Sequence, residues 1–257
     1  MTQENALIHS VQEIASNIFQ LSFVSPAISI KAIPGQFVNV RVEDSNVPLF
    51  RRPFSIFNIE GDIVSIIFNT VGMGTSLLSR KRPGNRLDVL GPLGNGGFPL
   101  RHENNSTLLI VAGGLGIAAF PFFTSRVAGD SKIVTFVGAR SSAYVVRTGL
   151  KNVQVATDDG SEGSRGTVVD LLKEYLAKHE LEHAHAHIFS CGPSAMMRAV
   201  SAIAREKRIP CHLALECEMA CGIGLCQGCP VESSNGEKKY RLVCKEGPVF
   251  DALDVNF

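Results

Sequence analysis

Apolar and polar side chains alternate with a period of two along several short runs in the first hundred residues. The run 36–42 follows a Pro-Gly turn signal, and two further runs lie at 62–68 and 86–90. Such alternation is typical of β-strands that have one buried face. Glycine and proline separate the runs, and short strands spaced by such turns predict a small barrel, to which we assign residues 1–102.

The hydrophobic pattern changes near residue 105, where continuous apolar runs replace the alternating ones. A strand of a parallel sheet is buried on both faces, so it appears in the sequence as such a run. Helical stretches are predicted between the runs, at 166–172 and 194–207. Strands that alternate with helices predict a doubly wound α/β domain, which we place at 103–210. The apolar runs lie at 108–112, 132–137, 153–156 and 187–190.

Composition narrows the classes of protein that this chain can represent. The 257 residues are 45% hydrophobic and 19% charged, with a net charge of +1, which is typical of a globular chain of about two domains. This charge gives no electrostatic footprint for nucleic acid or an anionic membrane. No apolar run approaches the roughly 18 residues of a membrane span, and the first residues lack a signal-peptide pattern. The odd number of cysteines, seven, favours a reducing compartment, so we expect a cytoplasmic protein.

Four cysteines near the C-terminus have the spacing of iron–sulfur ligands. Cys221, Cys226 and Cys229 lie in one glycine-rich loop, and Cys244 follows after fourteen more residues. The order C-x4-C-x2-C…C is that of plant-type [2Fe–2S] proteins, and a glycine-rich loop can point its backbone N–H groups at the sulfurs. Structural zinc sites usually place their ligands as two close pairs. A zinc site and plain buried thiols are therefore the competing interpretations.

Two further cysteines belong to the same C-terminal unit, which we place at 211–257, and neither fits the ligand spacing. Cys217 precedes Cys221 by four positions, and Cys211 lies earlier still. We therefore predict that Cys211 and Cys217 are spare thiols and that the four spaced cysteines are the ligands.

Two turns in the barrel region are candidate phosphate sites. Arg51 and Arg52 precede a proline, and an arginine fork binds phosphate through two parallel hydrogen bonds. Ser55 offers a hydroxyl to a flavin ring, although a solvated turn is the plainer interpretation of these residues. The run 72–75 opens a predicted helix whose free N–H groups can bind phosphate, but it is equally an ordinary helix start.

The carboxyl ends of two predicted parallel strands carry residues suited to a dinucleotide. Gly113, Gly114 and Gly116 lie between the first of these strands and a predicted helix, and glycines there let the backbone approach a pyrophosphate. The run is not G-x-G-x-x-G, so a tight turn without a ligand competes with this interpretation. Cys191 and Gly192 end another strand, where Cys191 either faces a nicotinamide or is a small buried thiol.

Three histidines, His183, His185 and His187, alternate along the chain, so one strand face could carry all of them. No carboxylate or cysteine clusters with them in the sequence, and strands commonly begin with solvated histidines, so a metal site is the less favoured interpretation. Spacing alone supports no Ser/His/Asp or Cys/His catalytic pair. We assign no catalytic residue to this chain.

Taken together, these motifs resemble the ferredoxin–NADP reductase superfamily and, within it, the electron-transfer subunits of B-type, NAD-dependent dihydroorotate dehydrogenases. The resemblance covers essentially the whole chain. Its most specific elements are the cysteine quartet and the tail 243–250, because the simple reductases lack both. The other matching elements are the runs 52–55, 67–69, 74–75, 91–95, 113–116, 158–161 and 191–193.

The resemblance implies the fold and the cofactors. We expect a six-stranded antiparallel barrel that binds FAD, a doubly wound parallel-sheet domain that binds NAD, and a small C-terminal [2Fe–2S] unit. It implies FAD contacts from Arg52, Pro53, Phe54, Ser55, Ile67, Phe68, Asn69, Gly74 and Thr75. It implies nicotinamide-nucleotide contacts from Gly113, Gly114, Gly116, Cys191 and Gly192. The loop 140–142 leaves the choice between NAD and NADP open, and NAD follows from the resemblance alone.

The resemblance also implies a partner. Dihydroorotate would be oxidised at the FMN of a separate catalytic subunit, in a heterotetramer of two copies of each chain. Electrons would then pass through the cluster and FAD of this chain to NAD+, in the synthesis of the pyrimidine UMP. Flavin and iron–sulfur subunits of a hydrogenase or a sulfur reductase would share these motifs. An iron–sulfur redox sensor without a productive flavin is the alternative of another class.

Overall fold

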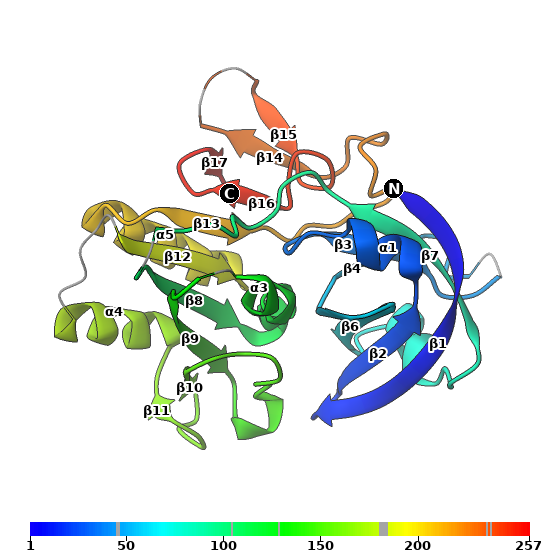
Figure 1. The fold of residues 1–257 in the computed structure, drawn as a ribbon, viewed down its shortest axis with the longest axis horizontal. Coiled ribbons are helices and arrows are strands. Elements are labelled where there is room, and N and C mark those ends of the chain that lie inside the picture. Colours follow the sequence, from blue (N-terminus) through cyan, green and yellow to red (C-terminus); the bar gives the residue numbers. More distant parts are fainter. Residues whose placement is uncertain (45–46, 104, 128, 180–184, 235, 237) are drawn as a thin grey trace.

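The computed structural model describes residues 1–44, 47–103, 105–127, 129–179, 185–234, 236 and 238–257. Two larger parts lie side by side: an N-terminal sheet, drawn in blue and cyan, and a second sheet with its helices, drawn in green and yellow (Figure 1). The C-terminal segment, in orange and red, lies along one side of both parts (Figure 1). The three parts therefore meet near the middle of the molecule.

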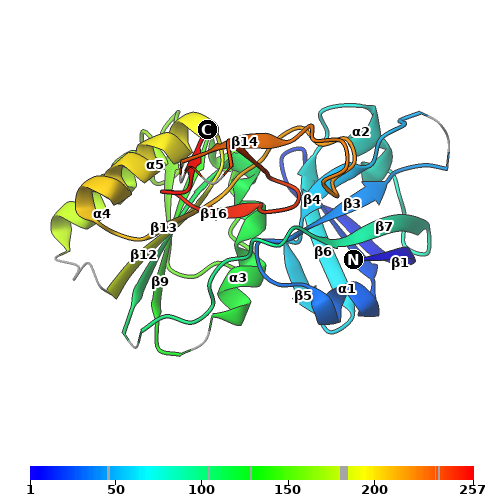
Figure 2. The same ribbon diagram turned by 90° about the horizontal axis from the view of Figure 1, so that it is seen from above.

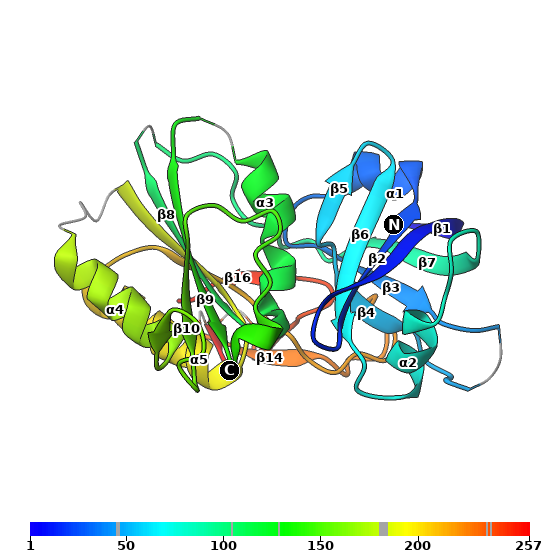
Figure 3. The same ribbon diagram turned by 90° about the horizontal axis from the view of Figure 1, so that it is seen from below.

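A seven-stranded antiparallel sheet forms the N-terminal part, in the order β4-β3-β7-β1-β2-β6-β5. The sheet curls on itself (Figure 3). Its apolar core includes Phe23, Ile66 and Val89. Its elements are β1 (Thr2–Ala15), β2 (Ile18–Val24), α1 (Pro26–Lys31), β3 (Phe37–Arg41), β4 (Arg52–Ser55), β5 (Asn58–Glu60), β6 (Ile63–Asn69), α2 (Met73–Ser79) and β7 (Arg86–Leu93).

Successive side chains of β3 point to opposite faces of the sheet, and this explains how the sheet packs against the C-terminal segment. Val38 and Val40 are fully buried in the barrel core, whereas Phe37 packs into the core that contains the C-terminal residues. Gly35, with φ of +97°, forms the turn before β3, and a Cβ at this position would lie 2.6 Å from Cγ2 of Val249. Only glycine allows both this backbone conformation and this close approach.

The second sheet has the order β11-β10-β9-β8-β12-β13-β16, and all of its pairs are parallel except β13 with β16. Helices α4 and α5 cover one face, while α3 lies on the face toward the barrel (Figure 2). The elements are β8 (Thr107–Gly113), η1 (Gly114–Ala119), α3 (Pro121–Arg126), β9 (Lys132–Ala139), η2 (Ser142–Tyr144), β10 (Val153–Thr157), β11 (Ser164–Arg165), α4 (Val168–Lys178), β12 (Ala186–Cys191), α5 (Ser194–Lys207), β13 (Cys211–Ala214) and β16 (Val249–Asp251).

The helix predicted after the glycine turn begins as a tight 3₁₀ segment. In η1 the N–H of Phe120 donates to the carbonyl of Ile117, three residues earlier. The α-helix α3 starts only at Pro121, which lacks an N–H and has a backbone angle suited to a first helical position. The residues after β8 therefore form a 3₁₀ segment followed by the short helix α3, instead of one continuous helix.

The C-terminal segment adds a small third sheet of β15 (Tyr240–Leu242), β14 (Pro230–Ser233) and β17 (Val255–Asn256). It is also joined to both larger parts, because β13 and β16 extend the parallel sheet and the N–H of Asn95 donates to the carbonyl of Lys245. The predicted fold class is confirmed, with seven strands in the antiparallel sheet. The boundaries at 102/103 and 210/211 stay predictions. Among the described residues, no helix is long and apolar enough to cross a membrane.

Candidate flavin, nicotinamide and iron–sulfur site

A cavity of about 280 Å³ opens where the three parts of the chain meet. The barrel, the turn after β8 and the C-terminal segment all contribute to its walls. Most of the lining side chains are apolar, with a few polar groups among them, as in pockets that bind flat cofactors. The lining residues are Phe37, Pro53, Phe54, Ser55, Ile67, Phe68, Asn69, Val71, Thr75, Leu115, Ala118, Leu215, Glu216, Cys217, Met219 and Pro248.

The barrel wall of the cavity comes from the ends of β4 and β6. Phe54 and Phe68 lie side by side, with ring centroids 5.6 Å apart and planes tilted by 50°. Ser55 and Asn69 are the polar residues of the same wall. The residues expected to contact the isoalloxazine of FAD are therefore brought together, as an apolar surface with two groups able to form hydrogen bonds.

The residues expected to hold the FAD phosphates also meet, at the start of α2. A Cβ on Gly74 would lie 3.2 Å from Nε of Arg52, so the guanidinium packs directly over the backbone at this glycine. One guanidinium N–H of Arg52 donates to the carbonyl of Phe50 at 2.5 Å, which holds the side chain in place. Oγ1 of Thr75 accepts the N–H of Val71 at 3.0 Å and so closes the turn. A fixed cation beside a tight backbone turn fits a phosphate group.

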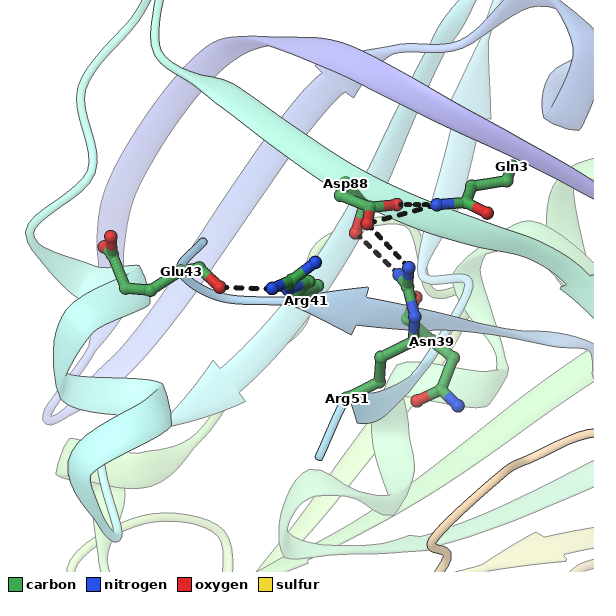
Figure 4. Close-up of polar contacts among 6 residues, drawn as sticks. All are labelled: Gln3, Asn39, Arg41, Glu43, Arg51 and Asp88. Carbon is green, nitrogen blue, oxygen red and sulfur yellow. Dashed lines mark hydrogen bonds and ion pairs between the residues drawn. The ribbon is translucent and has the colours of Figure 1, made fainter. Parts of the chain in front are cut away.

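Arg51 points the other way and supports the barrel. Its guanidinium forms an ion pair with Asp88 at 2.6 Å and donates to the backbone carbonyls of Asn39 and Asp88 at 3.3 and 3.1 Å. Gln3 donates to the same carboxylate at 3.0 Å (Figure 4). The two adjacent arginines therefore have different roles, and only Arg52 is directed toward α2.

The nicotinamide side is built by glycines that let two strand ends touch. A Cβ on Gly116 would lie 2.2 Å from the carbonyl oxygen of Cys191, and one on Gly192 would lie 2.9 Å from the nitrogen of Gly113. A Cβ on Gly114 would meet nothing within 4 Å. The predicted nucleotide residues thus adjoin one another at the carboxyl edge of β8 and β12, and Gly114 faces open space there.

Cys191 is paired with a carboxyl group that the sequence motifs did not single out. The Cys191 thiol, 1% exposed, donates to Oε1 of Glu216 at 3.9 Å. Burial raises the pKa of Cys191 well above its usual value, and the negative charge of Glu216 adds to this effect. Glu216 is open to the cavity, but the surrounding protein reduces the hydration of its carboxyl and raises its pKa. Its place just after the parallel strand β13 is the sequence signal that could have identified it.

The four spaced cysteines form one group in the C-terminal segment. The Sγ atoms of Cys229 and Cys244 lie 3.1 Å apart, and Sγ of Cys221 is close to the thiol of Cys226. Among the described residues, no three His, Cys, Asp or Glu side chains converge as the ligands of a single ion do. A cluster with two irons needs a wider arrangement of four sulfurs, and the thiols with their backbone donors fit that requirement.

Backbone N–H groups point at these sulfurs, as a negatively charged cluster requires. The N–H groups of Ile223 and Cys226 donate to Sγ of Cys221 at 3.5 and 3.4 Å, and that of Gly224 donates to Sγ of Cys244 at 3.1 Å. Burial raises the pKa of Cys221, but these and neighbouring donors outweigh it and lower the pKa to about 6. The loop therefore favours the thiolate at Cys221.

The pKa of Cys244 moves in the opposite direction. Burial and the adjacent Cys229 thiol raise the pKa of Cys244 to about 12. Two thiols this close cannot easily both ionise, and a bound metal cluster would remove that cost by sharing their charge. The pair is thus suited to bind iron and unsuited to exist as two free thiolates.

The two cysteines predicted to be spare occupy different places. Cys211 is buried in β13, and burial raises its pKa to about 12. Cys217 lines the cavity, and its thiol contacts that of Cys229; burial raises its pKa to about 12 as well. Cys217 therefore lies between the cavity and the cysteine group, which no sequence motif indicated.

Two of the three alternating histidines, His185 and His187, lie among the described residues, and they contact different partners. His183 lies outside the described residues, and Nδ1 of His185 lies 3.3 Å from Oε2 of Glu103. His187 instead meets His102, from the segment after the barrel, with ring centroids 4.7 Å apart. Nothing in these contacts supports a metal role for the alternating set.

Comparisons with known proteins agree with this arrangement. Residues 216–256 match the family described as the iron–sulfur cluster binding domain of dihydroorotate dehydrogenase B. A solved structure described as the NADH-dependent reduced ferredoxin-NADP oxidoreductase aligns with a TM-score of 0.85 and 29% identity, covering 98% of this chain and 90% of that chain. A ferredoxin NADP+ reductase from Neisseria gonorrhoeae with bound FAD and NADP shares the fold, with a TM-score of 0.64 and 16% identity over 80% of this chain and 92% of that chain.

Relatives of known name align over almost the full length. The protein named "Dihydroorotate dehydrogenase B (NAD(+)), electron transfer subunit" from Desulforamulus reducens is 35% identical, covering 98% of this chain and 97% of that protein. The protein of the same name from Geobacillus sp. is 35% identical, covering 99% of both. At this identity over nearly the whole chain, the protein belongs to the family of electron transfer subunits of dihydroorotate dehydrogenase B.

Proposed function

We propose that this chain carries electrons from a dihydroorotate-oxidising catalytic subunit to NAD+, as one step of pyrimidine synthesis. The observation that carries the proposal is the cavity at which the barrel, the nucleotide edge and the cysteine segment meet. Bound FAD supplies the chemistry that such a meeting point needs, because a flavin exchanges a hydride with nicotinamide and single electrons with an iron–sulfur cluster. The protein supplies binding, orientation and electrostatics.

Different residues around the cavity would bind the FAD phosphates, the flavin ring and the NAD. Arg52, with the backbone at Gly74 and the turn closed by Thr75, would hold the FAD phosphates. Ser55 and Asn69 would fix the flavin ring against the apolar wall formed by Pro53, Phe54, Ile67 and Phe68. On the opposite side, the open backbone at Gly114 would receive the NAD pyrophosphate, and Cys191 would face the nicotinamide as a neutral thiol because its pKa is raised.

The cysteine segment would connect this cavity to the partner. Cys221, Cys226, Cys229 and Cys244 are the proposed ligands, and Cys217 contacts both the cavity and Cys229, so the gap between flavin and cluster would be short. On the far side, Cys226 is exposed and Leu225 is 77% exposed. This outer edge of the loop is the place where we expect the FMN-containing catalytic subunit to approach, in a heterotetramer of two copies of each chain.

We further propose a cytoplasmic location, which is supported by the seven free thiols of the chain. Disulfides form and persist in oxidising compartments, whereas free cysteines and an iron–sulfur cluster suit a reducing one. Fractionation of the native cells, with the chain followed by antibody, would test this location. Recovery mainly outside the cytoplasmic fraction would contradict it.

The function is tested by reconstitution. The purified chain, loaded with FAD and cluster, should be bleached by NADH and should reduce artificial acceptors, but it should not oxidise dihydroorotate. Addition of the FMN-containing dihydroorotate dehydrogenase from the same cell should give dihydroorotate-dependent NADH formation, and loss of the cluster should abolish it. Dihydroorotate oxidation by the chain alone would contradict the division of labour. Absence of turnover with that partner would favour a different flavin-linked complex, as the likeness to the NADH-dependent ferredoxin-NADP oxidoreductase allows.

A further inference from the structure

Asn39 is a polar residue in a place where burial alone favours an apolar one. It lies on β3, is 1% exposed, and its Oδ1 has no hydrogen-bond partner among the described residues. A buried acceptor without a partner costs on the order of 1–3 kcal/mol of stability, and an apolar side chain of the same shape would avoid that cost. The reason for an asparagine at this position must therefore lie in the NH2 group of its amide.

This NH2 group contacts the cysteine loop. Nδ2 of Asn39 donates to the backbone carbonyl of Cys221 at 3.2 Å, across 182 positions of sequence. A Cβ on the next residue, Gly222, would lie 2.5 Å from the same Nδ2, and φ of Gly222 is +67°. The contact thus depends on glycine at 222, and it attaches the barrel to the loop at its first proposed ligand.

The barrel side of this contact is held firmly. Arg51 donates to the backbone carbonyl of Asn39 while its guanidinium pairs with Asp88, and Gln3 donates to that same carboxylate (Figure 4). The backbone of Asn39 also pairs with Pro53 on β4 and Leu90 on β7. Asn39 is therefore a fixed point of the barrel from which the side-chain amide extends to the loop.

The loop side of the contact lies next to the N–H groups that face the sulfurs. Ile223, Gly224 and Cys226 follow the anchored carbonyl within five residues, and their N–H groups donate to the Sγ atoms of Cys221 and Cys244. Hydrogen bonds to the sulfurs set the reduction potential and the retention of an iron–sulfur cluster. The position of the Cys221 carbonyl consequently determines how well these donors are aimed.

We propose that Asn39 is a positioning residue for the cluster: its amide anchors the Cys221–Gly222 backbone to the barrel and thereby aims the N–H donors of the loop at the sulfurs. The inference rests on the proposed cluster ligands. It assigns the barrel, whose cavity wall would bind the flavin, a second role as the support for the cysteine loop. It also predicts that the cluster responds to a residue that touches no sulfur.

The test compares two variants of the full chain, loaded with FAD and cluster. Asn39→Leu removes the donor and keeps a similar branched shape, while Ser65→Ala removes a buried hydrogen bond to Ser22, 2.8 Å long, elsewhere in the barrel. Asn39→Leu should lose its cluster to an iron chelator on the order of ten-fold faster than the wild type. Its reduced-state EPR signal and its cluster potential, followed by EPR titration, should shift. Flavin content and flavin bleaching by NADH should stay unchanged, and Ser65→Ala should match the wild type in every cluster measurement.

Other outcomes separate this inference from the proposed function. Identical EPR signal, potential and chelator loss in Asn39→Leu and wild type would overturn it and leave the function intact. A wild-type chain without any [2Fe–2S] spectrum would overturn both. If Asn39→Leu does not fold, Gly222→Ala provides the same test from the loop side, because its Cβ would lie 2.5 Å from Nδ2 of Asn39 and would displace the amide from the carbonyl of Cys221. An unaltered cluster in that variant would equally overturn the inference.

Discussion

The imidazole rings of His102 and His187 lie 4.7 Å apart, where the segment after the barrel crosses the parallel sheet. His212 is close by, stacked on Phe189 at 5.6 Å. Nε2 of His102 and Nδ1 of His187 and His212 are buried without a hydrogen-bond partner among the described residues. The site is therefore suited to neutral rings.

This cluster predicts that the protein loses stability in mild acid. Burial lowers the pKa of His102, His187 and His212, and the charges of the neighbouring histidines lower it further for His187. The carboxylates of Glu103 and Asp251 oppose the effect only in part. As pH falls, the unfolded chain takes up protons on these histidines near pH 6.5, before the folded chain does. Their contribution to the free energy of unfolding is therefore fully present above pH 6.5 and is lost as pH falls through the lowered pKa values.

His187→Phe should therefore flatten the dependence of stability on pH. Each histidine that stays neutral only in the folded state contributes at most about 1.4 kcal/mol per pH unit to the slope. Urea unfolding between pH 7.5 and 5 would measure the slope, with the exposed His9→Gln as a matched control. An equal slope in the His187 variant and the wild type would show that the ring takes up its proton equally in the folded and the unfolded protein.

Serine variants of single cysteines should distinguish ligands from spare thiols. Serine at Cys221, Cys226, Cys229 or Cys244 should abolish the EPR signal of the reduced [2Fe–2S] cluster, because a four-thiolate site loses one ligand. Cys211→Ser and Cys217→Ser should retain the signal, and Cys211, which is buried in β13, is the control for the loss of a thiol outside the loop. Loss of the cluster in Cys217→Ser together with retention in Cys221→Ser would mean that the ligand assignment is wrong.

Alanine variants of the two adjacent arginines should differ in flavin retention and in stability. Arg52→Ala should release flavin on gel filtration with little change in the stability of the flavin-free chain, because the side chain packs over Gly74 in the proposed phosphate site. Arg51→Ala should retain flavin but lower the free energy of unfolding by about 2 kcal/mol, since it loses charged hydrogen bonds to Asp88 and the barrel backbone. Flavin content and urea unfolding measured on both variants check this. Equal flavin loss in the two would place the phosphate site elsewhere.

Alanine substitutions at two glycines after β8 should have different effects, one on the stability of the chain and the other on nucleotide binding. Gly116→Ala should destabilise the chain by about 2 kcal/mol, because its Cβ would lie 2.2 Å from the carbonyl oxygen of Cys191. Gly114→Ala has open space and a φ of +54°, so it should fold with a strain of about 1 kcal/mol. It should instead raise KM for NADH roughly ten-fold, the equivalent of about 1.4 kcal/mol. An unchanged KM would remove Gly114 from the nucleotide site.

Much of the fold was predictable because its signals are local. The helix predicted at 194–207 is α5, and the glycine-rich cysteine loop has its thiols grouped as the spacing indicated. The contacts that join the parts were not predictable, because they connect distant segments. Asn39 and Cys221 are 182 positions apart, and Glu216 meets Cys191 only after two strands have paired into the same sheet. The place of Glu216 just after β13 is the one local signal of its contact, and nothing in the residues around Asn39 indicates that it reaches Cys221.

FAD bound in the cavity shared by the barrel, the nucleotide edge and the cysteine segment, as proposed above, would link the stability of the protein to the supply of riboflavin, from which FAD is made. A cofactor that binds only the folded chain stabilises it by about 2.7 kcal/mol at a free concentration one hundred times its Kd. Because the walls belong to all three parts, that gain is distributed over the whole chain. A shift of this size changes the unfolded fraction that proteases can reach by roughly one hundred-fold. A cell short of riboflavin would therefore hold less of this protein as well as a less active one.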